Sequence, residues 1–542
     1  MKLKLLLLTL FSSALMTLAI PNELFYYGSL PLALVALIPL FLALYHCRSI
    51  RYASFLGFIF AVTNSFATYF WLLFFQDFSV WTCTGVALGH ALYFSLLFPI
   101  FSHLLRRGGR YRSVLIAAAW VSYEYLKSIG YIGFPWGLLA YPLENLLPLI
   151  QIADSTGPWG ISFLAAMTNA ALAEFFLPRP GLIFTVDPRF SGGKLFRHLS
   201  RAPVGGLLFT AALYVLVLLY GALRLSAEIP YEKTLKVLLV QQNADSWVSG
   251  LEMPSIVKGQ NLTRQGLEEL QPDLVVWSEN SFREPYLKRS FQRRPKEDPF
   301  VPFLQEIDAP VLVGSPVVLD WEKRQVMNGA ILIDPRGDVL QTYGKQHPVP
   351  FAEHIPYWDV PAVRHFFTEV VGLQSAGWTL GTEYSIFRLT NASGQEVSFG
   401  VPICFEDAFP YLCRGFILQG ADLLVNITND SWSRTVSAET QHYAASMLRA
   451  VESRRVLVRS TNAGVTTVVD PFGRRLKTLP FFQEGYLAAE IPVYRDARAT
   501  VYLLYGDWFA WALILVTVGF LISFLPFLSE KGNTRKRQKK GR

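Results

Sequence analysis

The sequence predicts a bundle of membrane-spanning helices that carries an α/β domain outside the membrane. Hydrophobic residues make up 52% of the 542-residue chain, and the long apolar runs lie near its two ends. Charged residues concentrate between residues 227 and 503, where short apolar runs alternate with amphipathic segments. A membrane span needs about 20 apolar residues in a helix, whereas alternating strands and helices are typical of layered α/β domains. The chain therefore divides into two modules.

Eight apolar stretches are long enough to cross a membrane. Seven lie within residues 1–226, at 3–20, 29–46, 53–75, 80–104, 112–130, 158–177 and 204–226, and the eighth is 504–528. We therefore expect a seven-helix membrane domain over 1–226, the α/β domain over 227–503, an eighth span and a basic tail over 529–542. Residues 1–20 also fit a cleaved signal peptide, which would leave seven spans and keep the α/β domain on the same face.

The basic residues of the loops predict the orientation, because Lys and Arg are retained on the cytoplasmic side of a membrane. Alternate loops are basic and contain Arg48 and Arg51, then Arg106, Arg107, Arg110 and Arg112, then Arg179, Arg189, Lys194, Arg197 and Arg201. The intervening loops, 21–28, 76–79 and 131–157, contain neither Lys nor Arg. Lys2, Lys4 and the tail belong to the basic set. Both termini are therefore expected in the cytoplasm, with the α/β domain outside.

Charge and the membrane segments argue against two other classes of protein. The net charge of +8 arises mainly from the tail, and a solvated or headgroup-binding segment explains it, so no nucleic-acid partner is expected. Transport usually requires ionisable residues within the membrane. The spans contain few, among them Glu124 and Lys127 near an outer end, which could pair with each other. A transporter is therefore the weaker alternative to an enzyme.

The α/β domain contains short apolar runs that predict strands. These runs are 234–241, 273–278, 310–318, 329–333, 396–403, 423–427, 456–460 and 465–469, and helical patterns cover 258–270, 406–419 and 438–452. One internal echo links I-L-I-D-P-R-G-D-V-L at 331–340 with T-V-V-D-P-F-G-R-R-L at 467–476. Each segment is typical of a hairpin closed by a Pro and Gly turn. The echo suggests two related half-sheets.

Three reactive residues each follow an apolar strand-like run. Glu279 lies in W-S-E-N, Lys345 in Y-G-K-Q-H and Cys404 in V-P-I-C-F-E-D. A thiol, a carboxylate and an ammonium are the groups that acyl transfer through a thioester needs. The chain has four cysteines and no disulfide framework, and we expect Cys47, Cys83 and Cys413 to be packing residues. His347, Glu353 and His354 lack a recognised metal-ligand spacing, so no metal or other cofactor is expected.

These motifs together resemble the carbon-nitrogen hydrolase, or nitrilase, superfamily. The matching segments are V-V-W-S-E-N around Glu279, Y-G-K-Q-H-P-V-P-F-A-E around Lys345 and V-P-I-C-F-E-D around Cys404. With spans on both sides of the domain, with G-F-P-W at 133–136 and I-T-N-D-S-W at 427–432, the whole chain is similar to the apolipoprotein N-acyltransferase family. The resemblance implies a nitrilase-like α-β-β-α sandwich joined to the multi-span helical bundle, with a Glu-Lys-Cys triad.

The resemblance also implies roles for individual residues. Cys404 would be the nucleophile, Glu279 the general base, and Lys345 the cation that stabilises the oxyanion. Supporting roles would fall to Glu353, Glu406, Phe405 and Trp247. Phe405 stands where the family often has Tyr, so any role of that hydroxyl is absent here, and the spacing of Trp247 to Glu279 matches only approximately.

The implied reaction moves an acyl chain from a membrane phospholipid to an acceptor protein. By resemblance, the acceptor is the α-amino group of the N-terminal diacylglyceryl-cysteine of an apolipoprotein. The implied location is the bacterial inner membrane, with the catalytic domain facing the periplasm, and we expect a monomer. A membrane-tethered amidase that hydrolyses small amides would share the triad but would not need eight spans.

Overall fold

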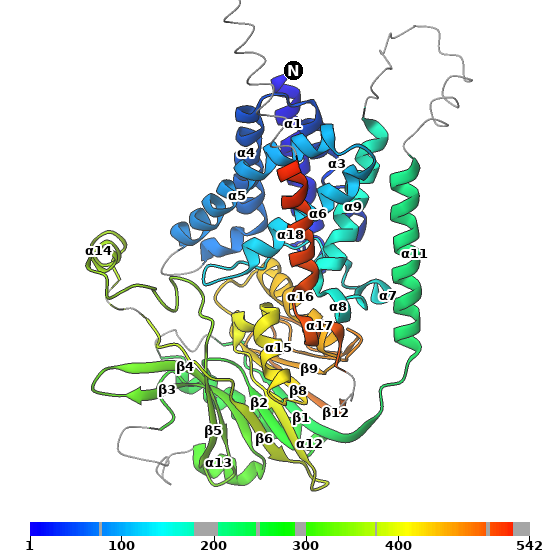
Figure 1. Ribbon diagram of the computed structural model, residues 1–542. Helices are drawn as coiled ribbons and strands as arrows, with labels where there is room; N and C mark the ends of the chain where they lie inside the picture. The colour runs from blue at the N-terminus through cyan, green and yellow to red at the C-terminus, as the bar shows by residue number, and fades with distance from the viewer. Residues whose placement is uncertain are drawn as a thin grey trace, which may run out of the picture.

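A helical bundle and a sheet domain are stacked end to end (Figure 1). The computed structural model describes residues 1–74, 79–177, 204–244, 250–287, 300–373, 375, 377–494 and 499–523. The longer bundle helices are α1 (Lys2–Ala19), α3 (Ile38–His46), α4 (Ile50–Thr68), α5 (Ser79–Arg107), α6 (Arg112–Ser128), α9 (Pro158–Phe176), α11 (Val204–Ser226) and α18 (Trp508–Ser523). The N-terminus lies at the end of the bundle that is farthest from the sheets (Figure 1).

Five of these helices, α1, α4, α5, α9 and α11, are long and apolar enough to cross a membrane. Two shorter apolar segments, 30–46 and 508–522, fall on the predicted second and eighth spans. The predicted fifth span corresponds to α6, which has 17 residues. The expected count of eight spans therefore stays a prediction. The basic loop at 178–203 and the tail at 529–542, on which the predicted orientation depends, lie outside the described residues.

The sheet domain consists of two six-stranded sheets. The first has the order β12-β1-β2-β3-β4-β5 and the second β11-β10-β9-β8-β7-β6. The first six strands are β1 (Tyr231–Gln241), β2 (Leu274–Trp277), β3 (Val311–Asp320), β4 (Gln325–Ile333), β5 (Val339–Gly344) and β12 (Gly485–Tyr494). The others are β6 (Ile386–Thr390), β7 (Glu396–Gly400), β8 (Leu423–Thr428), β9 (Leu457–Thr461), β10 (Thr467–Val469) and β11 (Arg475–Thr478).

Both sheets have the same pattern of strand directions. β1, β2 and β3 are parallel, as are β7, β8 and β9, and an antiparallel hairpin follows each triplet. The repeated sequence at 331–340 and 467–476 forms the equivalent turns, between β4 and β5 and between β10 and β11. β2 and β8 are buried along their whole length, as is usual for parallel strands covered on both faces. The sequence echo therefore marks two related half-sheets.

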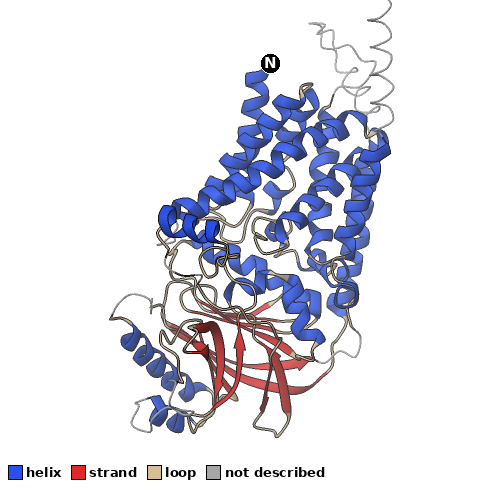
Figure 2. Cartoon of the chain, turned by 60° about the vertical axis from the view of Figure 1, so that its left-hand side comes forward, coloured by secondary structure: helices blue, strands red, loops and turns tan. Residues whose placement is uncertain are grey.

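The two sheets pack against each other and helices cover their outer faces (Figure 2). α12 (Glu252–Glu269) and α13 (Phe300–Ile307) cover the first sheet, whereas α15 (Pro410–Leu418) and α16 (Val436–Ser453) cover the second. The predicted α-β-β-α sandwich is confirmed. α16 also contacts α8 (Ala153–Thr156) and α17 (Val501–Tyr505), so it lies between the second sheet and the bundle.

α16 holds the two modules together through polar contacts at its ends. Near its start, Gln441 accepts a hydrogen bond from Trp71 and donates to the main-chain oxygens of Pro21 and Thr68. After its last turn, the buried Arg454 donates to Asp154 at 2.7 Å, from a left-handed conformation with φ of 53°. The chain can turn there because a left-handed residue commonly ends a helix. These contacts fix the sheet domain relative to the membrane helices.

The Asp154→Ala variant should destabilise the protein markedly. It leaves the guanidinium of Arg454 buried without its carboxylate, and breaking a buried ion pair in this way costs about 3–5 kcal/mol. We expect a clear fall in the midpoint of thermal unfolding in detergent. Glu306→Ala, which removes the partly exposed partner of Arg264, is the matched control and should cost less than about 1 kcal/mol. Equal shifts for both variants would show that the buried pair does not hold the modules together.

Candidate active site

The three predicted catalytic residues meet at one edge of the sandwich. Glu279 follows β2, Lys345 directly follows β5, and Cys404 begins a short 3-10 helix, η5 (Cys404–Ala408), after β7. The carboxyl ends of the parallel strands in each half-sheet lie at the same edge, so residues that directly follow them can gather there. Residues separated by more than a hundred positions are thereby brought into contact.

Lys345 is buried between two carboxylates. Its Nζ lies 3.3 Å from Oε1 of Glu279 and 2.8 Å from Oε1 of Glu353. Lys345 is 2% exposed and Glu279 3% exposed. Asn328 on β4 donates to both carboxylates, at 2.8 and 3.1 Å. The main-chain N–H of Asn429 donates to the other oxygen of Glu279 at 3.0 Å. The charges are therefore paired and their oxygens are satisfied, as burial requires.

The two carboxylates beside Lys345 keep its side chain positively charged. Burial by itself would lower the pKa of Lys345, but Glu279 and Glu353 outweigh it and raise the pKa well above its usual range. Lys345 is therefore a permanent ammonium group. Burial raises the pKa of Glu279, and Lys345 opposes that shift. A carboxylate whose pKa is raised is a stronger base than an ordinary surface glutamate.

Cys404 lies beside this cluster in an unusual backbone conformation. Its φ is +50°, in the left-handed region that non-glycine residues seldom adopt, and its side chain is buried. The thiol lies near the carboxylate of Glu279, whose negative charge acts on it. Burial, reinforced by the negative charge of Glu279, raises the pKa of Cys404 well above its usual range, although Lys345 opposes the shift. The resting residue is therefore a thiol, and attack requires that Glu279 take its proton.

Glu406 joins the Cys404 turn to the turn that follows Lys345. One of its oxygens accepts from the main-chain N–H groups of Gln346 at 2.7 Å and His347 at 3.0 Å, and the other accepts from Ile403 N–H at 2.8 Å. The hydroxyl of Tyr343 donates to both. Burial raises the pKa of Glu406 to about 7, although the hydrogen bonds from these N–H groups lower it. Glu406 thus fixes the distance between nucleophile and lysine without facing the thiol.

The other predicted residues differ in their placement. Phe405 stacks on Trp136 of the G-F-P-W loop, with ring centroids 5.1 Å apart and planes inclined by 16°. Trp247 lies outside the described residues. Glu124 and Lys127 both hold the loop that carries Trp136: Lys127 donates to the main-chain oxygen of Trp136, and Glu124 accepts from Leu139 N–H at 2.8 Å. The sequence indicates only that Glu124 and Lys127 could pair with each other, and it does not predict that they support this loop.

Sequence reasoning missed three residues of the site. Asn328 is a buried amide in the middle of a largely apolar strand, and that pattern is a usable signal. The sequence marks Trp136 only as part of the G-F-P-W motif. His442 lies in a polar stretch, A-E-T-Q-H-Y, on a helix that is buried throughout, and neither its period nor its neighbours distinguish it. Its contacts come from residues distant in sequence, so only the folded chain identifies it.

A cavity leads from Cys404 to the membrane helices. It has a volume of about 480 Å³ and its lining is mostly apolar. At its inner end lie Cys404, Phe405 and Trp136, while Gly85 and Gly89 of α5 line the part within the bundle. Phe351, Phe366 and Phe367 of the sheet domain form another part of the wall. A cavity shared by both modules connects the thiol to the apolar part of the bundle.

The sandwich and its Glu-Lys-Cys cluster define the carbon-nitrogen hydrolase class. Residues 303–499 match the carbon-nitrogen hydrolase family, and residues 12–171 match the apolipoprotein N-acyltransferase N-terminal domain. The first range contains Lys345 and Cys404, whereas Glu279 precedes it. In the solved structures, the chain is similar to an amidase from a Nesterenkonia species, with 17% identity and a TM-score of 0.35, over 52% of this chain and 96% of that one.

Relatives that match along the whole chain identify the family. Apolipoprotein N-acyltransferase 2 of Treponema denticola is 38% identical over 514 residues, which is 94% of this chain and 95% of that protein. The apolipoprotein N-acyltransferase of Borreliella burgdorferi is 31% identical, over 96% of this chain and 95% of that protein. The chain therefore belongs to the apolipoprotein N-acyltransferase family of enzymes.

Alkylation of Cys404 by iodoacetamide should depend steeply on pH. The thiolate is the reactive form, and because the pKa of Cys404 is raised, its rate should increase about tenfold per pH unit up to about pH 9, without reaching a plateau. Lys345→Met removes the positive charge that opposes the raised pKa of Cys404, so it should slow the reaction at any one pH. Peptide mass analysis measures the modification at Cys404 alone. A plateau below about pH 8 would show a resting thiolate instead.

Proposed function

We propose that this protein transfers an acyl chain from a membrane phospholipid to the N-terminal α-amino group of a diacylglyceryl-modified apolipoprotein. The observation that carries the proposal is the apolar cavity that joins Cys404 to the membrane helices. A small polar amide would not need such a cavity. Moving a lipid chain into water costs about 0.8 kcal/mol for each exposed CH₂, so a thiol that reacts with lipid must be reached from within the bilayer.

In the first half-reaction, the carboxylate of Glu279 takes the proton of the Cys404 thiol as sulfur attacks the ester carbonyl. Negative charge develops on the carbonyl oxygen, and the ammonium of Lys345 stabilises it. The tetrahedral intermediate then expels the alcohol of the lysophospholipid, which receives the proton from Glu279. A thioester on Cys404 is left behind. The buried cluster is organised before the reaction, so little reorganisation is required when the charge appears.

In the second half-reaction, the α-amino group of the acceptor attacks the thioester. Glu279, again a carboxylate, accepts a proton from the amine, and the Cys404 sulfur leaves and is reprotonated. An amide forms and the free thiol is restored. Lys345 stabilises the second oxyanion in the same position. The two substrates therefore use one site in turn, and no cofactor is needed.

Trp136 is suited to bind an oxygen of the donor. Its side chain is 3% exposed and lies in the cavity wall beside Phe405. Its indole N–H has no hydrogen-bond partner within the part of the chain that the structure describes. A buried indole N–H usually has an acceptor, and the ester or glycerol oxygens of a phospholipid would provide one next to Cys404.

The proposed location is the bacterial inner membrane, with the sheet domain in the periplasm and both termini in the cytoplasm. The N-terminus and the sheet domain lie at opposite ends of the bundle, which supports opposite sides of the membrane (Figure 1). The basic residues of alternate loops support the same orientation. One chain contains both the Glu-Lys-Cys cluster and the cavity that reaches Cys404, so we propose that a monomer is active.

Intact-mass analysis of the purified protein with phospholipid should reveal an acyl adduct on Cys404. Wild type should gain the mass of one acyl chain, and hydroxylamine should remove it because a thioester is labile to that reagent. Cys404→Ala should gain no acyl mass, while Cys413→Ala, the control with another buried thiol removed, should behave as wild type. An unmodified wild-type protein that hydrolyses small amides would favour the amidase alternative.

Narrowing the cavity should affect lipid donors selectively. Gly89 lies on α5 in the cavity wall, and a Cβ there would meet open space. In Gly89→Leu the new side chain should enter the cavity and lower acyl transfer from phospholipid about tenfold or more, whereas acylation by a short ester such as p-nitrophenyl acetate should change little. Gly519→Leu on α18 is the matched control, because it adds the same side chain at an open position outside the cavity. An equal loss with both donors would contradict a lipid-binding cavity.

A further inference from the structure

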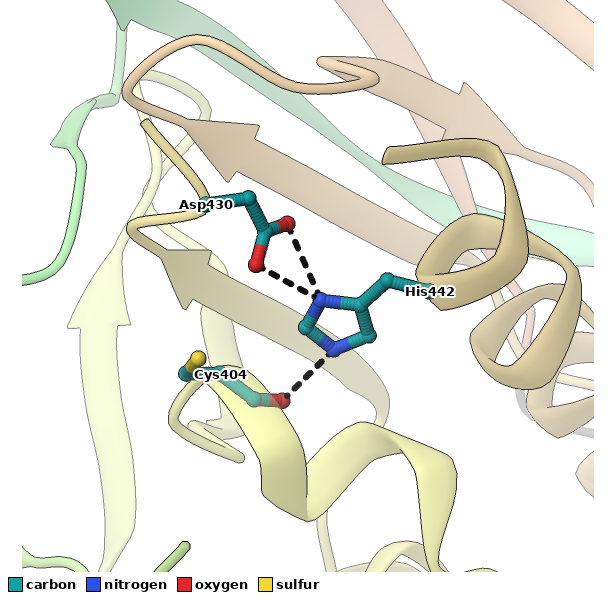
Figure 3. A group of neighbouring side chains, drawn as sticks. All are labelled: Cys404, Asp430 and His442. Atoms are coloured by element: carbon teal, nitrogen blue, oxygen red, sulfur yellow. Dashed lines mark hydrogen bonds and ion pairs between the residues drawn. The ribbon is translucent and has the colours of Figure 1, made fainter. Parts of the chain in front are cut away.

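A second buried cluster of charges lies beside the Cys404 turn, and Figure 3 shows its members Asp430 and His442. His442 of α16 is at its centre. Its Nδ1 lies 2.9 Å from both oxygens of Asp430, and its Nε2 lies 3.0 Å from Asp407 and 3.3 Å from the main-chain oxygen of Cys404. Arg459 of β9 pairs with Asp407 and, at 3.2 Å, with Asp430. The mechanism proposed above uses none of these side chains.

The hydrogen bonds require His442 to be an imidazolium. Ionised carboxylates and main-chain oxygens only accept hydrogen bonds, so both ring nitrogens must donate. Burial would raise the pKa of Asp430, but His442 and Arg459 outweigh it and lower the pKa, so Asp430 is ionised. Burial would lower the pKa of His442, and so would the positive charge of Arg459. Asp430 and Asp407 outweigh both effects and raise the pKa to about 9. Glu439, a further carboxyl beside Asp430, has its pKa raised well above its usual range by burial and by Asp430, so it holds a proton.

A soft metal ion is not the best occupant of this cluster, although Cys404, Asp430 and His442 offer ligand atoms within 4.8 Å of one another. A histidine binds metal through a nitrogen without a proton. Both nitrogens of His442 carry protons and already have partners. The ring also faces the carbonyl oxygen of Cys404, and its hydrogen bond goes there rather than to sulfur (Figure 3).

The bond to the Cys404 carbonyl acts on a strained part of the site. Cys404 has a left-handed φ, so its conformation must be held by its surroundings. The N-terminal side of the turn is held by Glu406, which accepts from Ile403 N–H. The C-terminal side is the Cys404–Phe405 peptide, and its oxygen accepts from His442. Asn426 adds a longer contact of 3.5 Å to the same oxygen.

A planar trans peptide points its C=O and its N–H in opposite directions. Holding the Cys404 carbonyl toward His442 therefore turns the N–H of Phe405 toward the opposite side. A cationic donor on the carbonyl also polarises the peptide and makes its N–H a stronger donor. We propose that His442 is a positioning residue that orients and polarises the Cys404–Phe405 peptide, so that the Phe405 N–H joins Lys345 in stabilising the oxyanion. The role rests on the proposed acylation of Cys404.

Single-turnover acylation by p-nitrophenyl butyrate, followed by intact mass, tests this role. His442→Gln should lower the acylation rate constant about 10- to 100-fold and leave the half-saturating ester concentration within about threefold, because positioning acts on the transition state. The wild-type rate should decline as pH rises through about 9, where His442 loses its proton. His442→Gln should lack that decline. Thr440→Val, which removes a buried hydroxyl from the same helix, should match wild type.

Asp430→Asn provides a second measurement if His442→Gln does not fold. The substitution removes the charge that raises the pKa of His442, so the alkaline decline should move to lower pH, toward about 6.5, the usual value for His. A decline that stays near pH 9 in Asp430→Asn, or that persists in His442→Gln, would overturn the assignment, as would a wild-type rate in His442→Gln. The ester acylates Cys404 without any lipid. If the ester acylates Cys404 and phospholipid does not, the proposed phospholipid donor is refuted but the role of His442 is not.

Discussion

The burial of the Lys345 ammonium constrains the rest of the site. A cation in this position is tolerated only when carboxylates pair with it, and Glu279 and Glu353 do so. The same pairing gives Glu279 and Lys345 their chemical roles, since one carboxylate is near the thiol and the ammonium stays charged. Asn328 and the main chain at Asn429 satisfy the remaining oxygens. Because the polar atoms of this cluster already have partners in the folded protein, the cluster can stabilise a transient charge with little rearrangement.

Two buried clusters of charges lie beside Cys404, and hydrogen bonds hold its backbone both before and after the residue. Glu406 links the residues before the nucleophile to the turn after Lys345, and His442 contacts the carbonyl after it. These side chains come from η5 and α16, and their partners lie on β5, in the turn after β5, in the segment after β8 and in η5 itself. A left-handed cysteine is unfavourable in isolation, and the surrounding hydrogen bonds make it the stable conformation. The geometry of the nucleophile therefore depends on the whole sandwich.

The membrane helices complete the site. Trp136 of the bundle stacks on Phe405, and the cavity that ends at Cys404 is lined by residues of both modules. Polar contacts of α16 with α8 and with the segments at Pro21 and Thr68 fix the position of the sheet domain relative to the bundle. In the proposed reaction a lipid chain stays in an apolar environment while its ester reaches a polar, preorganised cluster. The fold thus places the Cys404 thiol where an apolar cavity meets a polar cluster.

Two modules, most of the strands and the three reactive residues could be predicted from the sequence, because apolar periodicity and the motifs near Glu279, Lys345 and Cys404 are local properties. Even the repeat at 331–340 and 467–476 predicted the two related half-sheets. The partners of Lys345, the left-handed turn at Cys404 and the charge of His442 could be found only in the folded chain. These properties depend on atoms contributed by residues far apart in the chain, and the burial that shifts a pKa exists only after the sheets and helices have packed.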